Sequence, residues 1–267
     1  MKNTYKLGVV GAGFMSTAIV KGIISSKTLS PSDIVVSDVN QTALNKMTEI
    51  GVDVTADNSE IFSRAEFVLF AVKPQNFKDV ASGIKETSCK KFISIMAGVK
   101  KQRIKDMLGD VKVARCMPNT PCSIGCGAVG IDVSDYKKED AAFIKSLFCS
   151  IASVVEITED KFGIVTGISG SSPAYFYLFL KGIIEKGVKA GLSYDDAKLL
   201  ATATMIGAGK MVEKNNDKTL DELILAVCSK GGTTIEAVKV YEKNKIGEIT
   251  EKAIDACVKR SNELENI

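Results

Sequence analysis

Histidine is absent from this chain of 267 residues. Without an imidazole, the chain cannot build a Ser-His-Asp or Cys-His nucleophilic system, a histidine-ligated zinc site or a histidine acid-base catalyst. Most hydrolase and metalloenzyme designs are therefore excluded. The chemistry that remains is the kind that an organic cofactor carries, while the protein supplies binding, orientation and charge.

Long apolar runs and blocks of like charge are also missing. No apolar segment approaches the roughly 20 residues of a membrane-spanning helix, and the first apolar stretch, at residues 7–14, is interrupted by Gly8, Gly11 and Gly13. We therefore expect neither a membrane segment nor a signal peptide. The net charge is +3, and acidic and basic residues alternate along the chain, so nucleic acid is not an expected partner.

The seven cysteines are odd in number and include no Cys-x-x-Cys pair. This pattern is typical of reduced thiols and predicts a cytoplasmic location. Cys116, Cys122 and Cys126 lie close together in the sequence, but no fourth soft ligand is nearby. We expect three buried thiols and no metal site.

The first 160 residues alternate β-branched runs with helix-length segments of mixed three- and four-residue apolar spacing. The expected strands are residues 6–10, 34–37, 67–72, 92–95, 111–116 and 128–131, with 153–157 as a final candidate. The expected helices are residues 15–25, 41–50, 76–84, 101–107 and 138–151. This alternation predicts an α/β domain of the Rossmann type over residues 1–160, a doubly wound and mainly parallel sheet that is covered on both faces.

Residues 161–267 contain helical segments without a convincing strand between them, and we predict a small all-helical domain there. Its expected helices are residues 173–190, 194–214, 219–227, 235–243 and 246–263. Residues 174–184 are apolar around most of the helix, so every side must contact protein. Burial against a second subunit is the prediction, and a central helix inside a monomeric domain is the alternative.

The segment Gly11-Ala12-Gly13-Phe14-Met15-Ser16 follows the first expected strand directly and opens the first expected helix. In that context a G-x-G-x-x-G pattern indicates a dinucleotide site, although Ser16 stands where Gly or Ala is usual. Gly11 permits the tight turn, Gly13 lets the backbone approach a pyrophosphate, and the helix N-terminus offers free amides. A bare strand-to-helix turn is the alternative.

The second expected strand ends in Ser37-Asp38-Val39-Asn40, where the adenosine ribose of a dinucleotide is expected. The Asp38 carboxylate suits the 2′-hydroxyl of NAD and repels a 2′-phosphate, whereas Ser37 and Asn40 are able to donate to a phosphate. Ordinary turn chemistry is the alternative explanation. The cofactor is therefore left as NADPH or NADH.

Five segments occur in an order and at a spacing similar to those of one family. They are Gly11-x-Gly13-x-Met15, Ala71-Val72-Lys73-Pro74-Gln75, Arg115-Cys116-Met117-Pro118-Asn119-Thr120-Pro121, Gly170-Ser171-Ser172-Pro173-Ala174-Tyr175 and Gly231-Gly232-Thr233-Thr234. Together they resemble the pyrroline-5-carboxylate reductase family over essentially the whole chain. The Pro-Asn-Thr-Pro and Gly-Gly-Thr-Thr segments are more specific than the glycine fingerprint, which occurs in many unrelated sequences.

The resemblance implies NAD(P)H-dependent reduction of the cyclic imine 1-pyrroline-5-carboxylate to proline, the last step of proline biosynthesis. Hydride transfer to an imine needs no protein nucleophile, which agrees with the missing histidine. The implied cofactor residues beyond Gly11 and Gly13 are Phe14, Met15, Ser37, Asp38, Asn58, Ala71, Val72, Lys73, Pro74, Met96, Ala97, Gly98, Pro118 and Asn119. Alternative explanations are a solvated lysine for Lys73, a core side chain for Met96 and chain reversal for the prolines.

Residues 229–234 precede the helix expected at 235–243, so backbone amides and hydroxyls meet at a helix N-terminus, which suits a carboxylate. A capping box from Thr233 to Glu236 is the alternative, but paired glycines favour close approach of a ligand. The resemblance assigns Thr234 to the ring nitrogen, as the candidate proton donor and catalytic residue. It assigns the substrate carboxylate to this same turn, through Ser229, Gly231, Gly232 and Thr233.

The sequence departs from the family at Lys230, Ser172 and Ala203, where Pro, Gly and Gln are common, and none of these changes removes a proposed donor. The resemblance further implies that residues 161–267 are a dimerisation and substrate-binding domain. The expected assembly is a homodimer with interlocked helical domains, in which the substrate site lies between one subunit's nucleotide domain and its partner's helices, and five dimers in a ring are the higher assembly. Two other functions fit parts of the sequence. A redox sensor that never turns over needs no carboxylate turn, and a β-hydroxyacid dehydrogenase needs a helical Lys-Asn pair that has no counterpart here.

Overall fold

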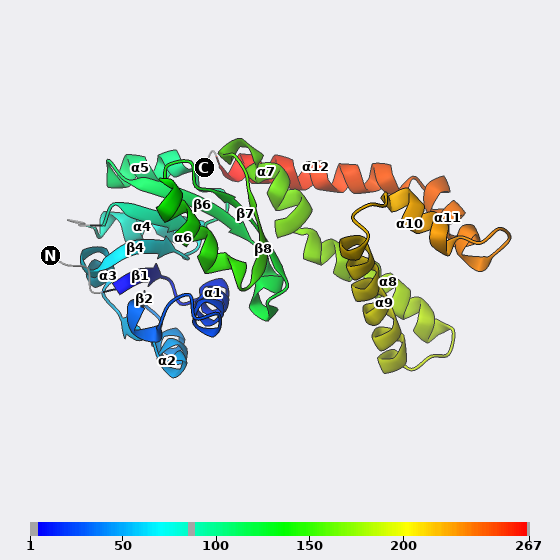
Figure 1. Cartoon of the computed structure of the whole chain (residues 1–267), viewed down its shortest axis with the longest axis horizontal. Helices are drawn as coiled ribbons and strands as arrows, with labels where there is room; N and C mark the ends of the chain where they lie inside the picture. Colours follow the sequence, from blue (N-terminus) through cyan, green and yellow to red (C-terminus); the bar gives the residue numbers. More distant parts are fainter. Residues whose placement is uncertain (1–4, 85–88, 266–267) are drawn as a thin grey trace. The chain divides into compact units, whose positions relative to one another are not determined.

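In a computed structural model, residues 5–84 and 89–265 are described (Figure 1). The chain divides into two compact units, Met1–Pro173 together with Ala256–Ile267, and Ala174–Asp255. The boundaries fall inside helices α8 (Ser172–Lys189) and α12 (Ile246–Leu264), so each of these helices contributes residues to both units. The functional division at residue 160 stays a prediction.

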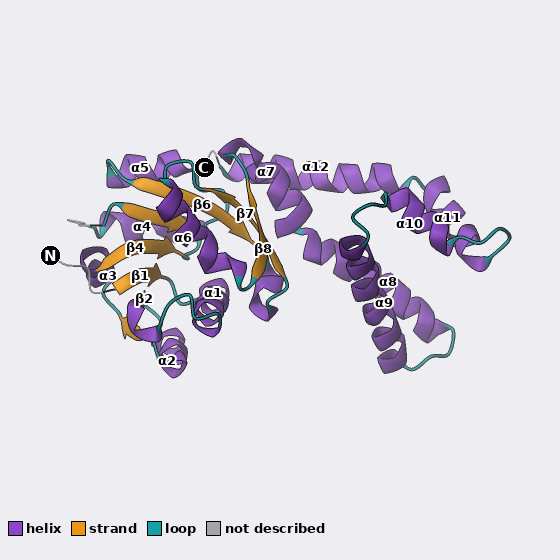
Figure 2. Cartoon of the chain, in the orientation of Figure 1, coloured by secondary structure: helices purple, strands orange, loops and turns teal. Residues whose placement is uncertain are grey.

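The first unit is built on a sheet whose described strands follow the order β3-β2-β1-β4-β5-β6-β7-β8. Neighbouring strands run parallel except β6 and β7, which are antiparallel. This order confirms the predicted doubly wound, mainly parallel sheet (Figure 2). The strands are β1 (Tyr5–Val10), β2 (Ile34–Ser37), β3 (Asp53–Thr55), β4 (Ala65–Phe70), β5 (Lys91–Ser94), β6 (Lys112–Pro118), β7 (Gly127–Asp132) and β8 (Ala152–Glu156).

Helices cover both faces of this sheet, and β4 shows why. Successive side chains of a strand point to opposite faces. Phe67 and Leu69 pack with α1 and α6 in one buried cluster, whereas Val68 and Phe70 pack with α3, α4 and α5 in the other. Near-continuous burial along β4 is the pattern of a strand that is covered on both sides. The helices of this unit are α1 (Phe14–Ser25), α2 (Gln41–Ile50), α3 (Asn58–Arg64), α4 (Phe77–Ser82), α5 (Lys101–Leu108), α6 (Lys138–Cys149) and α7 (Phe162–Val165).

The sequence analysis missed β3 and α3. The strand β3 has three residues that are half-buried or exposed, and α3 has seven residues, so neither carries a full period of apolar positions. Asp57 accepts the backbone N–H of Ser59 and caps α3, which is the local signal that marks its start. The two missed elements complete the crossover from β2 to β4.

The second unit is all-helical over its described residues. Residues 172–189 form α8, and the other helices are α9 (Tyr194–Lys214), α10 (Leu220–Val227), α11 (Thr233–Lys243) and α12. Side-chain caps fix two starts: Ser193 accepts the N–H of Asp196 at α9, and Thr219 forms a capping box with Glu222 at α10. A π-helical turn, Thr166–Gly170, leads into α8. None of the described helices has the length and hydropathy that crossing a bilayer requires.

The apolar residues of α8 remain open to solvent in the single chain. Phe176 is 56% exposed, Tyr177 62% and Leu178 72%. Apolar surface on this scale marks an interaction site in a folded protein. The exposure argues against the alternative of a central helix in a monomeric domain and agrees with burial against a second subunit.

Candidate functional site

The glycine-rich loop lies at the topological switch point of the sheet, where the order of strand addition reverses. β1 pairs with β2 on one side and β4 on the other, and the chain crosses over in opposite senses from there, which is where open α/β sheets bind ligands. Gly11 has φ +107°, and a Cβ added to it would lie 2.7 Å from the carbonyl oxygen of Ala71. The loops after β1 and β4 therefore touch through a backbone that only glycine accommodates.

Gly13 is the N-cap of α1 and leaves its surroundings open. A Cβ placed there meets nothing within 4 Å, no side chain caps the helix, and its first turn carries no acidic residue. The hydroxyls of Ser16 and Thr17 instead donate to the carbonyl of Gly13 at 3.0 and 2.8 Å. An uncapped helix start with open space before it fits a pyrophosphate. Phe14, 64% exposed, flanks this opening.

The residues at the end of β2 are tied to their own chain. Asp38 accepts the backbone N–H of Ala12 at 2.7 Å and that of Asn40 at 2.8 Å. The buried Ser37 hydroxyl donates to Asn58 Oδ1 at 2.7 Å, so these two predicted cofactor residues touch each other. The turn chemistry that the sequence allowed is therefore formed, and ribose contact by Asp38 stays a prediction.

The predicted residues after β4 and β5 lie at the same sheet edge, because parallel strands share their carboxyl ends. Ala71 and Val72 are half-buried, and Lys73 and Pro74 are exposed.

After β5, Met96 is 3% exposed and packs in the core, as the alternative explanation for it stated. Ala97 is exposed. Gly98 has φ +71° and faces Leu264.

At the end of β6, the side-chain amide of Asn119 links two neighbouring segments by hydrogen bonds. Its Oδ1 accepts the N–H of Ala128 at 3.0 Å, and its Nδ2 donates to the carbonyl of Ser169 at 3.3 Å. This amide joins the turn after Pro118 to the π-helical turn before α8. β6 runs parallel to β5, so Pro118 and Asn119 lie at the same edge of the sheet as the glycine loop.

In the second unit, α11 begins two residues earlier than the sequence predicted, at Thr233, and its N-cap is Gly232. No side chain caps this helix, so the capping box from Thr233 to Glu236 is not formed. The turn before it closes through the N–H of Gly232, which donates to the carbonyl of Ser229 at 2.9 Å, and Gly231 has φ +75°. Hydroxyls and uncapped amides therefore gather at one helix start, as an anion site requires.

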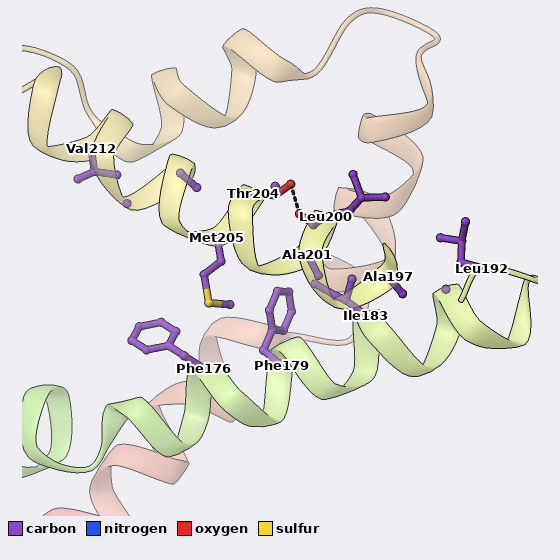
Figure 3. A pocket seen from close by; sticks show the side chains of 13 residues that line it. Phe176, Phe179, Ile183, Leu192, Ala197, Leu200, Ala201, Thr204, Met205 and Val212 are labelled. Carbon is purple, nitrogen blue, oxygen red and sulfur yellow. Dashed lines mark hydrogen bonds between the residues drawn. The ribbon is translucent and has the colours of Figure 1, made fainter. Parts of the chain in front are cut away.

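An apolar groove of about 800 Å³ lies between α8 and α9 within the second unit. Phe176 and Phe179 point from α8 toward Met205 on α9 (Figure 3). Leu200 on α9 also lines the groove and is 59% exposed. The groove holds almost no polar side chains, so it suits protein side chains better than a charged imino acid.

The cysteine prediction is wrong at one position. Cys116 and Cys122 are buried, and burial raises the pKa of both thiols above the ordinary value. Cys126 is exposed, because it lies between the left-handed Gly125 that ends a short turn and the first residue of β7. Among the described residues, no three Cys, Asp or Glu side chains gather in a way that would hold a metal ion.

Sequence reasoning missed a buried arginine. The side chain of Arg115 in β6 is only 4% exposed and pairs with Glu159 and Glu265. The sequence did contain a signal for it: an arginine among the apolar residues of a buried strand needs an acidic partner nearby. Its partner Glu265 lies 150 positions away in the chain, so no local pattern pointed to the pair.

Comparison with known proteins gives matches along the whole chain. A family model described as pyrroline-5-carboxylate reductase dimerisation matches residues 159–264, and one described as NADP oxidoreductase coenzyme F420-dependent matches residues 6–98. Pyrroline-5-carboxylate reductase of Pisum sativum is 36% identical over 267 residues, covering 99% of this chain and 97% of that one.

Two solved structures are similar throughout. A pyrroline-5-carboxylate reductase from Coxiella burnetii has a TM-score of 0.89 and 32% identity, covering 98% of this chain and 99% of that one. Plasmodium falciparum pyrroline carboxylate reductase with NADP bound has a TM-score of 0.87 and 29% identity, covering 99% and 100%.

The fold and the match over residues 6–98 define a class, the nicotinamide-dependent oxidoreductases with a Rossmann-type fold. The glycine-rich loop lies at the topological switch point of the sheet, where such folds bind a dinucleotide. Identity over the full length narrows that class. The chain belongs to the pyrroline-5-carboxylate reductase family. The resemblance drawn from five sequence segments is therefore confirmed, and so is the prediction of a nicotinamide dinucleotide cofactor.

Proposed function

We propose that this chain catalyses the reaction for which its family is named, the reduction of 1-pyrroline-5-carboxylate to proline, with NADPH or NADH as hydride donor. The observation that carries the proposal is the uncapped start of α11 at Gly232 and Thr233, in the region that matches the reductase dimerisation model. A carboxylate is the part of this substrate that such a helix start recognises. The bound cofactor supplies the hydride, so the protein needs no nucleophile.

The dinucleotide site is proposed for the carboxyl edge of the sheet. Gly11 and Gly13 admit the pyrophosphate, and the free amides at the start of α1 neutralise its charge. Ser37, Asp38 and Asn58 form the ribose side. The nicotinamide end is proposed to lie along the residues that follow β4, β5 and β6, namely Ala71, Val72, Lys73, Pro74, Met96, Ala97, Gly98, Pro118 and Asn119.

The substrate site is proposed for the turn at residues 229–234. Ser229, Gly232 and Thr233 hold the carboxylate, and the left-handed Gly231 keeps the turn open to it. The Thr234 hydroxyl hydrogen-bonds the ring nitrogen and orients the imine. Because a threonine hydroxyl is a weak acid, two routes for the proton stay open, arrival with the protonated imine or transfer through Thr234.

The assembly is proposed to be a homodimer in which a second copy covers the groove between α8 and α9, and five such dimers in a ring form the higher assembly. The apolar groove and the exposed aromatic residues of α8 support self-association. Residues 1–160 then serve as the dinucleotide domain and residues 161–267 as the dimerisation and substrate domain. A cytoplasmic location is proposed as well, and the seven free thiols support it.

Isotope transfer tests the proposed reaction. The purified protein is incubated with 1-pyrroline-5-carboxylate and a reduced cofactor in which both hydrogens at nicotinamide C4 are deuterium, and the product is analysed by mass spectrometry. We expect proline with a single deuterium on the former imine carbon. Proline without deuterium, or no proline with either NADPH or NADH, would contradict the proposal.

A further inference from the structure

The C-terminal end of α12 packs against the loop that follows β5. A Cβ added at Gly98 would lie 3.1 Å from the Cβ of Leu264 and 3.3 Å from its carbonyl oxygen. The next residue, Glu265, accepts a hydrogen bond from Arg115 Nη2 at 2.6 Å and lies 3.5 Å from Lys100 Nζ. These contacts all lie within the first unit, to which residues 256–267 belong.

Arg115 links the end of α12 to the start of α5, the helix that follows the loop after β5. Its Nη1 lies 3.4 Å from Glu159, and its guanidinium packs 4.4 Å from the centre of the Phe162 ring. Glu159 Oε1 in turn accepts the backbone N–H of Lys101, the first residue of α5, at 2.7 Å. One buried arginine therefore connects Glu265 with the start of α5 through two carboxylates, and such charge-assisted bonds fix geometry firmly.

The loop between β5 and α5 is anchored on both sides of Ala97 and Gly98, since Val99 is 2% exposed and packs in the same core cluster as Met96. Met96 is anchored by its buried side chain and by its N–H, which donates to Ser94 Oγ at 3.3 Å. Ala97 is exposed, and Gly98 adopts a left-handed conformation against Leu264. Between these two buried anchors, the Ala97–Gly98 backbone contacts the end of α12, where Glu265 forms its ion pair with Arg115.

We propose that Arg115 and Glu265 are positioning residues for the reductase reaction: they hold the end of α12 against Gly98 and so fix the backbone at Ala97 and Gly98. The inference rests on the proposed function, which sets the nicotinamide end along this loop. Neither residue touches a reacting atom, so the ion pair acts on orientation and not on affinity at the glycine loop. Misplacing a bound reactant slows the chemical step without abolishing binding.

Glu265→Gln tests the proposal, with Glu263→Gln as the matched control. Both lie at the end of the same chain segment and pair with an arginine, but Glu263 bonds the exposed Arg260 and its side chain is 46% exposed, against 10% for Glu265. We expect Glu265→Gln to lower kcat by about tenfold, with the Kd of the oxidised dinucleotide changed by less than about twofold. Glu265→Asp, which keeps the charge, is expected to recover part of the loss.

Hydrogen exchange of the cofactor-free protein gives a second readout that needs no turnover. We expect the amides of residues 95–100 to exchange faster in Glu265→Gln than in Glu263→Gln or the unmodified protein. Unchanged exchange in this segment, or an unchanged kcat in Glu265→Gln, overturns the proposal. If the unmodified protein does not reduce the imine, the proposed function fails, and the exchange comparison alone decides whether the ion pair holds the loop.

Discussion

Asp38 holds the backbone N–H of Ala12 at 2.7 Å, and its other carboxylate oxygen holds the N–H of Asn40 at 2.8 Å. A single side chain thus ties the glycine loop after β1 to the turn that starts α2. The hydrogen bond leaves Asp38 beside the proposed ribose site but occupied by its own chain. Its proposed role in choosing between NADH and NADPH is therefore coupled to its hydrogen bonds within the loop.

Asp38→Ala is expected to weaken the binding of both dinucleotides, because the glycine loop loses its tether. NADPH binding is expected to weaken less than NADH binding, since the change also removes a negative charge near a 2′-phosphate. The free energy of unfolding is expected to fall by about 1.5–3 kcal/mol, the contribution of hydrogen bonds to a charged group. Calorimetric titration with each cofactor and denaturant unfolding measure these effects. Unchanged stability would show that Asp38 does not tether the loop.

The two glycines of the loop are expected to fail differently. Gly11→Ala brings a Cβ within 2.7 Å of the Ala71 carbonyl at φ +107°, so it is expected to destabilise the fold as well as to abolish dinucleotide binding. Gly13→Val meets open space, so the protein is expected to fold with a loss of under about 1 kcal/mol and to lose cofactor binding selectively. Thermal unfolding and dinucleotide titration are compared for both variants. Retained cofactor affinity in Gly13→Val would rule out a pyrophosphate at α1.

Thr234→Ala is expected to lower kcat/KM for the imine by about a hundredfold, within the range for a lost proton-transfer group, while cofactor affinity stays unchanged. Thr48→Ala, at an exposed helical threonine in the first unit, serves as the control and is expected to leave the rate unchanged. Steady-state kinetics with varied imine and dinucleotide titration separate the two effects. An equal loss of cofactor affinity in Thr234→Ala would contradict the assignment.

Lys101 is the centre of a buried charge cluster, and its removal is expected to change the pH dependence of stability. Burial alone would lower the pKa of Lys101, but bonds to Asp132 and Asp135 outweigh it and raise that pKa above 10.5. Burial alone would raise the pKa of each carboxyl, but the bonds that each accepts, including those from Lys101, lower it below 3.8. The stabilisation is therefore present between these limits, and it is lost as pH falls below 3.8 or rises above 10.5.

Lys101→Met is accordingly expected to cost about 3–5 kcal/mol at neutral pH, because the buried Asp132 loses its cationic partner, while the half-buried Asp135 keeps its ion pair with Lys105. The difference from the unmodified protein is expected to shrink as the pH falls below 3.8, because those carboxylates then bind protons and no longer need a cationic partner. Lys161→Met, which removes an exposed pair with Asp160, is the control, and no measurable loss of stability is expected. Denaturant unfolding across pH measures both. A loss from Lys101→Met that stays constant with pH would contradict the ionic explanation.

Self-association is expected to depend on the groove between α8 and α9. Leu200→Glu puts a charge on an apolar side chain that is 59% exposed in the single chain, and we expect it to give monomers in sedimentation experiments. Thr48→Glu adds the same charge to an exposed position on α2 and is expected to leave the assembly unchanged. A Leu200→Glu protein that sediments like the unmodified one would show that the groove between α8 and α9 is not the interface.

Elements with a clear local pattern were predicted from the sequence, whereas short elements and the pairing of distant strands were not. The bounds of β2, α2 and α9 agree exactly with the predicted ranges, because caps such as Asn40 and Ser193 and clear apolar periods mark their ends. Short β3 and α3 have no such period. The antiparallel pairing of β7 with β6 could not be predicted from the sequence either, since a strand's direction depends on its pairing across the sheet and not on its own residues.

The candidate site shows the same limit. Gly11 and Gly13 follow from the strand-loop-helix pattern, whereas the assignment of Ser229 and Thr234 came from family resemblance. The tie between Asp38 and Ala12, the hydrogen bonds of Asn119 and the pair of Arg115 with Glu265 join residues far apart in the chain. Only a folded structure brings such partners together.

The most direct test of the central claim is loss of reduced-nicotinamide absorbance when the purified protein meets 1-pyrroline-5-carboxylate, run in parallel with NADH and NADPH at matched concentrations. We predict rapid oxidation with at least one of the two cofactors, abolished in Gly13→Val and strongly reduced in Thr234→Ala. Binding of both cofactors without oxidation of either would contradict the account.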